Sequence, residues 1–148
     1  MPVPSPIMSA VSELHFPVLL WRKGYSFVAS SPLELCTHPR SLIVETQKLA
    51  TAGEFTVADS AGRICKVKGY ERVPPFGGVM RLPHLVLRSV YAAPVLGEVT
   101  QPSLAEFINT ISKALGARFG KSFKQTLLQT QSSGEAMALV AKRESKAG

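Results

Sequence analysis

Hydrophobic and polar positions over residues 16–29 follow the pattern of a β-hairpin. Residues 16–21 are mostly apolar, residues 22–24 read Arg-Lys-Gly, and residues 25–29 are apolar and aromatic again. A short polar segment that contains glycine and separates two apolar runs is typical of a hairpin turn. The pattern therefore predicts two paired strands near the start of the chain.

A second hairpin is predicted over residues 54–73. Phe55 and Val57 alternate with polar neighbours, residues 59–62 read Asp-Ser-Ala-Gly, and the alternation resumes at Cys65. A period of two places successive side chains on opposite faces of a strand, and the four-residue segment has the chemistry of a turn. The pattern therefore predicts a second pair of antiparallel strands.

Two segments carry the start signal of a helix. Residues 31–34 (Ser-Pro-Leu-Glu) and 103–106 (Ser-Leu-Ala-Glu) each place a serine three residues before a glutamate, which is a capping box. The first helix must end before Pro39, whereas the second continues with apolar residues at helical spacing as far as Leu115. Residues 42–52 are also interpreted as a helix, although their β-branched residues favour a strand.

These elements predict an α+β fold. Two hairpins and a further strand at residues 85–91 make an antiparallel sheet of four or five strands, and the amphipathic helix at about residues 103–115 packs on one face. Residues 1–10 are expected to form a flexible lead-in, and residues 11–130 a single α+β domain. Residues 131–148 are expected to be loosely docked or partly disordered, because their apolar face is thin.

Composition places the chain among folded proteins. It has 148 residues, of which 45% are hydrophobic and two are cysteines. A domain of this size buries an adequate core without disulfide bonds. Residues 1–10 carry no positive charge, and no apolar run is long enough for a signal peptide or a membrane span. We therefore expect a cytoplasmic protein with reduced thiols and no membrane partner.

The formal net charge of +7 is compatible with acidic partners, either nucleic acid or the acidic surface of another protein. The positive residues are spread along the chain and form no run of five or six. Charge alone therefore does not choose between these partners, and nothing in the sequence indicates an oligomeric state.

A basic face is predicted on the second strand of the second hairpin. Alternation places Lys66, Lys68, Tyr70 and Arg72 on one side of that strand. Cations around an aromatic side chain resemble a surface that holds a phosphate backbone and stacks a base. The alternative is an ordinary solvated face, and no nucleic-acid-binding motif accompanies these residues. A nucleic-acid-associated domain is therefore the second interpretation of function.

No catalytic, metal-binding or cofactor motif is complete. Residues 116–122 resemble a phosphate-binding loop, but the glycine spacing is one residue short and the segment follows a predicted helix instead of a strand. Cys36 and His38 lie two residues apart, yet a metal site would need further ligands and a nucleophile would need an orienting group. We predict no cofactor and no metal. A small enzyme with an unrecognised site at Cys36 and His38 is the third interpretation.

Residues 73–84 combine apolar side chains with a backbone that cannot pair regularly, because prolines stand at both ends and two glycines in the middle. Phe76 and Met80 would then be anchors for a protein partner, and Arg81 would add a charged contact at the rim. The first interpretation is therefore a non-enzymatic accessory protein that binds another protein. It would be of the adaptor or toxin-neutralising, immunity-like type, with an acidic partner favoured by charge.

Overall fold

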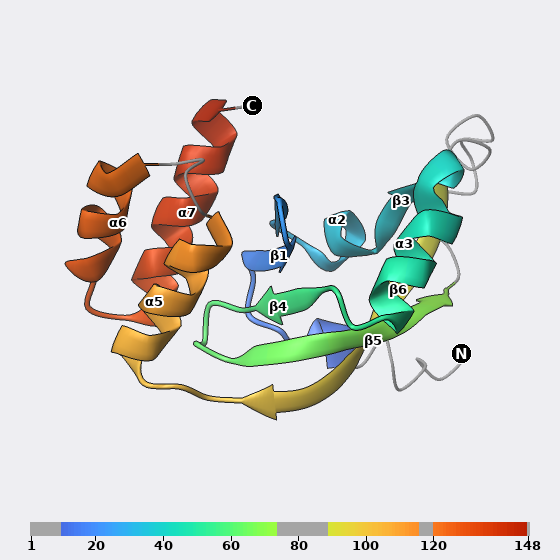
Figure 1. The fold of residues 1–148 in the computed structure, drawn as a ribbon, viewed down its shortest axis with the longest axis horizontal. Coiled ribbons are helices and arrows are strands. Elements are labelled where there is room, and N and C mark those ends of the chain that lie inside the picture. The colour runs from blue at the N-terminus through green and yellow to red at the C-terminus, as the bar shows by residue number, and fades with distance from the viewer. Residues whose placement is uncertain (1–9, 74–88, 116–119, 148) are drawn as a thin grey trace.

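Residues 10–73, 89–115 and 120–147 of the chain are described by a computed structural model. Within these ranges the fold is α+β, as the sequence predicts, with helices placed around one curled antiparallel sheet (Figure 1). The strands are β1 (Val18–Arg22), β2 (Tyr25–Ala29), β3 (Thr37–Pro39), β4 (Thr56–Ala58), β5 (Ile64–Arg72) and β6 (Ser89–Thr100). The helices are α2 (Pro32–Cys36), the 3₁₀ turn η1 (Arg40–Leu42), α3 (Ile43–Thr51), α5 (Leu104–Leu115), α6 (Gly120–Leu128) and α7 (Ser133–Ala147).

The sheet has the strand order β2-β1-β4-β5-β6-β3, and each neighbouring pair is antiparallel. Both predicted hairpins are present: β1 pairs with β2 around Gly24, whose φ is 78°, and β4 pairs with β5. The described residues contain six strands, whereas four or five were expected. The additional strand is β3, which has three residues and pairs Thr37 with Tyr91 at the start of β6.

The serine of each predicted capping box caps its helix start. Ser31 Oγ accepts the backbone N–H of Glu34 at 3.3 Å, and Ser103 Oγ accepts that of Glu106 at 3.2 Å. Each serine thereby satisfies a backbone donor that the first turn of a helix leaves unpaired. The helix predicted at residues 42–52 is also present, as η1 followed by α3. No helix in the described part of the chain is long and apolar enough to cross a membrane.

Two groups of buried side chains lie on opposite faces of β1 and β4, because successive strand residues point to opposite sides. Leu20 and Val57 belong to the first group, together with residues of α2, α3 and β5. Leu19 and Ala58 belong to the second group, together with residues of α5, α6 and α7. Figure 1 shows the same division, with α5, α6 and α7 gathered at one end of the molecule and α2 and α3 toward the other.

The C-terminal helix α7 contributes to the second group of buried side chains. Ala136, Met137 and Val140 are completely buried. These three positions share one side of the helix, so a narrow apolar stripe is enough to dock it. This stripe packs α7 against the second group of buried side chains.

Candidate functional site

The alternation of buried and exposed side chains on strand β5 reverses partway along the strand. Lys66 and Lys68 are exposed, as alternation predicts. Between Val67 and Gly69 the register with β6 shifts, because β5 advances by two residues while β6 advances by one. The extra residue is a β-bulge, which reverses the alternation. Tyr70 is therefore only 6% exposed, and the prediction that it shares an exposed face with Lys66 and Lys68 is wrong.

A hydrogen bond joins helix α3 to β5 at this bulge. The backbone N–H of Tyr70 donates a hydrogen bond to Gln47 Oε1 at 2.7 Å. A bulge disrupts the hydrogen-bond ladder locally and leaves a backbone N–H without an acceptor in the sheet. Here a side chain from a neighbouring helix is the acceptor. Gln47 therefore holds α3 directly against the part of β5 that carries Tyr70.

A cavity of about 460 Å³ lies on one side of α3, and we call it the larger cavity. Its volume is within the range of small-molecule sites, about 300–1,000 Å³. Its wall is mainly apolar and is formed by Leu20, Phe27, Leu35, Leu42, Leu49 and Phe55. Its polar groups include His38 and Tyr70, which are buried, and the charged side chains of Arg22, Glu34 and Glu45.

His38 and Tyr70 come from β3 and β5 and are in direct contact at the wall of the larger cavity. Their ring centroids are 4.7 Å apart and the ring planes are inclined by 81°, which is an edge-to-face arrangement. His38 Nε2 lies 2.9 Å from the carbonyl oxygen of Ala92, so Nε2–H donates there and Nδ1 is left as an acceptor. Burial lowers the pKa of His38, and this bond opposes the shift. The imidazole is therefore neutral at pH 7.

The hydroxyl oxygen of Tyr70 is buried and has no hydrogen-bond partner among the described residues. Burial raises the pKa of Tyr70, and the neighbouring Tyr25 and Cys36 add to the shift. The phenol is therefore protonated at neutral pH and remains a hydrogen-bond donor. Leaving such a group unpaired costs about 1–3 kcal/mol.

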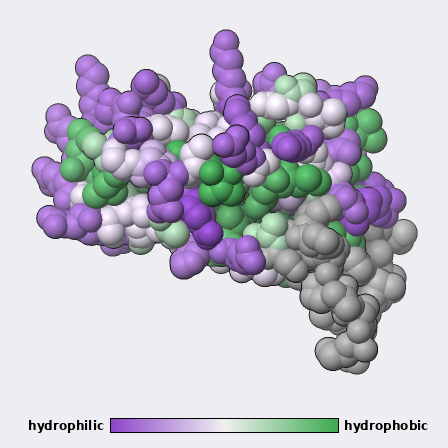
Figure 2. Space-filling view, turned by 90° about the horizontal axis from the view of Figure 1, so that it is seen from below, coloured by the Kyte–Doolittle hydropathy of each residue, from purple (hydrophilic) through white to green (hydrophobic). Residues whose placement is uncertain are grey.

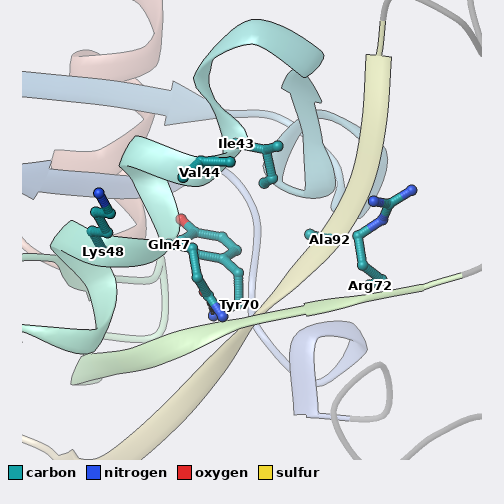
Figure 3. A pocket seen from close by; sticks show the side chains of 7 residues that line it. All are labelled: Ile43, Val44, Gln47, Lys48, Tyr70, Arg72 and Ala92. Atoms are coloured by element: carbon teal, nitrogen blue, oxygen red, sulfur yellow. Dashed lines mark hydrogen bonds between the residues drawn. The ribbon is translucent and has the colours of Figure 1, made fainter.

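A second cavity, of about 300 Å³, lies on the opposite side of α3, and we call it the smaller cavity. It is lined by Ile43, Val44, Gln47, Lys48, Tyr70, Arg72 and Ala92 (Figure 3). Figure 3 shows Tyr70 beneath α3, and Tyr70 lines both cavities. Lys48 and Arg72 give the smaller cavity two cations, and no acidic side chain in the described residues lines it.

No protein-family model, curated protein or solved structure matches this chain. The function must therefore be inferred from the geometry of the cavities and of the residues around them. In the described ranges, no three His, Cys, Asp or Glu side chains are grouped so that they could hold a metal ion.

Cys36, at the end of α2, and His38, on β3, are both buried. Burial raises the pKa of the Cys36 thiol to about 12, so it is protonated at neutral pH. Burial likewise raises the pKa of Cys65 to about 11. Both cysteines are free and buried, as the sequence indicates.

The other residues singled out from the sequence fall in three places. Tyr70 and Arg72 lie together at the smaller cavity. Lys66 and Lys68 lie apart from them on the exposed side of β5. The predicted contact residues, Phe76, Met80 and Arg81, lie outside the described residues.

Sequence reasoning missed Gln47 and the contact between His38 and Tyr70. These residues stand on α3, β3 and β5, and no local pattern relates three separate elements. One signal was available, because a glycine inside a strand often marks a bulge, and Gly69 directly precedes Tyr70.

Proposed function

We propose that this protein is a non-enzymatic binding protein for a small, mostly apolar molecule that occupies the larger cavity. The observation that carries the proposal is the mainly apolar wall of a cavity of suitable volume, about 460 Å³. The aliphatic and aromatic side chains of the wall would supply the apolar contact area for the ligand.

The state of the nearby ionisable groups supports binding without catalysis. His38 donates through Nε2 to a backbone carbonyl, and burial lowers the pKa of its ring. Cys36 has a pKa raised by burial and is not a thiolate at neutral pH. A nucleophile needs a lowered pKa or an adjacent base that is free to accept its proton. The first condition is not met by Cys36, because burial raises the pKa of its thiol.

The proposal is tested by titration of the isotopically labelled protein with 2-ethylnaphthalene, a neutral apolar probe, and observation of the backbone amides by NMR. We expect shifts at residues that line the larger cavity, such as His38 and Tyr70. Thr46→Trp places an indole at the cavity wall and should weaken binding at least tenfold. Thr110→Trp, on α5, is the matched control and should leave binding unchanged. Saturable binding that is insensitive to Thr46→Trp would contradict the proposal.

A second candidate function is the binding of an acidic protein along α3, in keeping with the partner class expected from the sequence. Leu42 and Val44 are 54% and 66% exposed at the two cavities. Lys48 and Arg72 stand beside Val44 without an acidic neighbour in the described lining of the smaller cavity. Apolar side chains flanked by cations fit an acidic partner with a central apolar anchor. A different face of the molecule, seen from below in Figure 2, carries hydrophobic surface near its middle.

This second candidate is tested by chemical cross-linking in cells followed by mass spectrometry. Val44→Glu should abolish a cross-link between α3 and an acidic partner, because it adds a repulsive charge at the apolar centre. Val99→Glu, which changes a valine that is 52% exposed on β6, is the control and should preserve the cross-link. An unchanged cross-link in both variants would exclude α3 as the contact.

A further inference from the structure

We infer that the smaller cavity is a second ligand site and that its ligand is an amphipathic anion, an apolar molecule with one carboxylate group. The inference does not rest on the proposed function, because the described linings of the two cavities have only Tyr70 in common. The smaller cavity combines an apolar wall, two cations, and a described lining without any acidic side chain.

The wall of the smaller cavity offers apolar contact area to a ligand. Its volume of about 300 Å³ is at the lower end of the range for small-molecule sites, about 300–1,000 Å³. Ile43 and Val44 form its α3 side, and the Tyr70 ring and Ala92 form its sheet side (Figure 3). Val44 is 66% exposed, so this part of the wall is in contact with solvent and is accessible to an apolar group.

Two cations stand at the ends of this apolar wall. Lys48 is in the last turn of α3, and Arg72 is the last residue of β5. Figure 3 shows them at opposite ends of the lining, with Ile43 and Val44 between them. Both cations are exposed, and neither forms an ion pair with another described residue. We place the carboxylate at Arg72, because a planar guanidinium binds a carboxylate through two parallel hydrogen bonds.

The chain supplies no acidic side chain to neutralise these cations. All ten of its Asp and Glu residues lie in the described ranges, and none of them lines the smaller cavity. Gln47 Oε1 already accepts the backbone N–H of Tyr70 at 2.7 Å. Lysine and arginine side chains are donors only. The charged groups at this cavity therefore favour a ligand group that is both an acceptor and an anion.

The extent of the surface distinguishes this ligand from the acidic protein of the second candidate function. A stable protein interface buries about 800 Å² on each partner. Here the apolar wall and both cations belong to one cavity that is lined by seven described residues. A concave site of this size fits a small molecule, whose apolar body covers the wall while its carboxylate stays at the exposed end.

The test is an NMR titration of the labelled protein at pH 7 with octanoate and with 1-octanol, which has the same chain length and no charge. Octanoate should shift the amides of Val44 and Ala92 saturably and bind about fivefold more tightly than 1-octanol. Arg72→Gln should remove this preference, whereas Arg72→Lys should keep part of it. Lys66→Gln is the matched control and should keep the preference, because it removes the same charge from an exposed residue of β5 that lines neither cavity.

The inference would be overturned by equal affinities for octanoate and 1-octanol, or by a preference that Lys66→Gln lowers as much as Arg72→Gln. Absence of saturable shifts at Val44 and Ala92 would also overturn it, and an acidic protein would remain as the occupant of this surface. Thr46→Trp, which changes the wall of the larger cavity, should leave octanoate binding unchanged. The two sites are thereby tested separately.

Discussion

At the scale of single residues, Asp59 is the most heavily bonded side chain in the described part of the molecule. It is completely buried and accepts hydrogen bonds from the backbone N–H groups of His15, Ala61 and Arg63. It also forms an ion pair with the Arg63 guanidinium at 2.7 Å, and Arg63 Nη2 donates in addition to the carbonyl of Glu13. Asp59 thereby joins the chain before β1 to the turn between β4 and β5.

We expect Asp59→Ala to destabilise the protein by about 2–4 kcal/mol, because it leaves three backbone donors and a partly buried guanidinium without their acceptor. Chemical denaturation followed by circular dichroism measures the effect. Glu71→Ala, at an exposed position on β5, is the control and should change stability by less than about 0.5 kcal/mol. If Asp59→Ala lowered the free energy of unfolding by less than about 1 kcal/mol, the hydrogen bonds to Asp59 would not be needed for stability.

The buried imidazole of His38 makes stability depend on pH. Burial lowers its pKa in the folded protein below the ordinary value of 6.5. The unfolded chain therefore binds a proton more readily, and folding stability is lost as pH falls below about 6.5 toward the folded pKa. His38→Gln should flatten this part of the profile, with a slope change of at most about 1.4 kcal/mol per pH unit.

The measurement is the unfolding free energy of both proteins at intervals from pH 7.5 to pH 5. Parallel profiles would mean that His38 binds its proton equally well in both states. His15→Gln serves as the control, since the His15 side chain is exposed, and its profile should follow that of the wild-type protein.

At the scale of elements, helix α7 tests how a thin apolar stripe contributes to the fold. Met137 is completely buried in the group formed with α5 and α6. We expect Met137→Ala to cost about 2–4 kcal/mol, because it removes buried apolar volume and leaves a cavity. Lys142→Ala, on the exposed side of the same helix, should be nearly neutral. Thermal unfolding of the two variants is the measurement. A lower melting temperature for Met137→Ala alone would show a docked helix, and equal melting temperatures would show a loosely held one.

Helix α3 shows how one contact places an element. Its sequence has both helical and strand propensity, since Ile43 and Val44 favour strands. No pattern within the helix specifies its position on the sheet. The hydrogen bond from Tyr70 N–H to Gln47 Oε1 supplies that position. Because residues on opposite sides of α3 line different cavities, the same contact determines where both cavities lie.

At the scale of the whole molecule, the net charge of +7 permits non-specific attraction to nucleic acid, but the basic face on β5 is smaller than its sequence suggests. Tyr70 is buried, so it is not available to stack on a base, and Lys66 and Lys68 remain exposed without it. Binding that depends on charge alone weakens steeply as salt rises.

We therefore expect labelled single-stranded oligonucleotides to bind only at low salt and to be released at physiological salt. Lys66→Glu with Lys68→Glu should lower the low-salt affinity and reduce the dependence on salt by about two phosphate contacts. The titration is a fluorescence anisotropy measurement at several salt concentrations. Binding that persists at physiological salt and is lost in the double variant would favour the nucleic-acid interpretation.

Local patterns in the sequence were sufficient for the fold class and for most elements. Hairpins with a polar, glycine-containing turn depend on neighbouring residues, and so do capping boxes at Ser31 and Ser103. Buried thiols at Cys36 and Cys65 also follow from composition and alternation. These features were predictable because each is decided within a few residues of chain.

Only the tertiary structure decided the candidate site. The three-residue strand β3 exists because it pairs with β6, and the direction of Tyr70 depends on a bulge that is defined by the register of β5 against β6. The cavities arise where α2, α3 and the sheet fail to fill the space between them. Pairing register and packing volume join residues far apart in the chain, so a pattern read along one segment does not contain them.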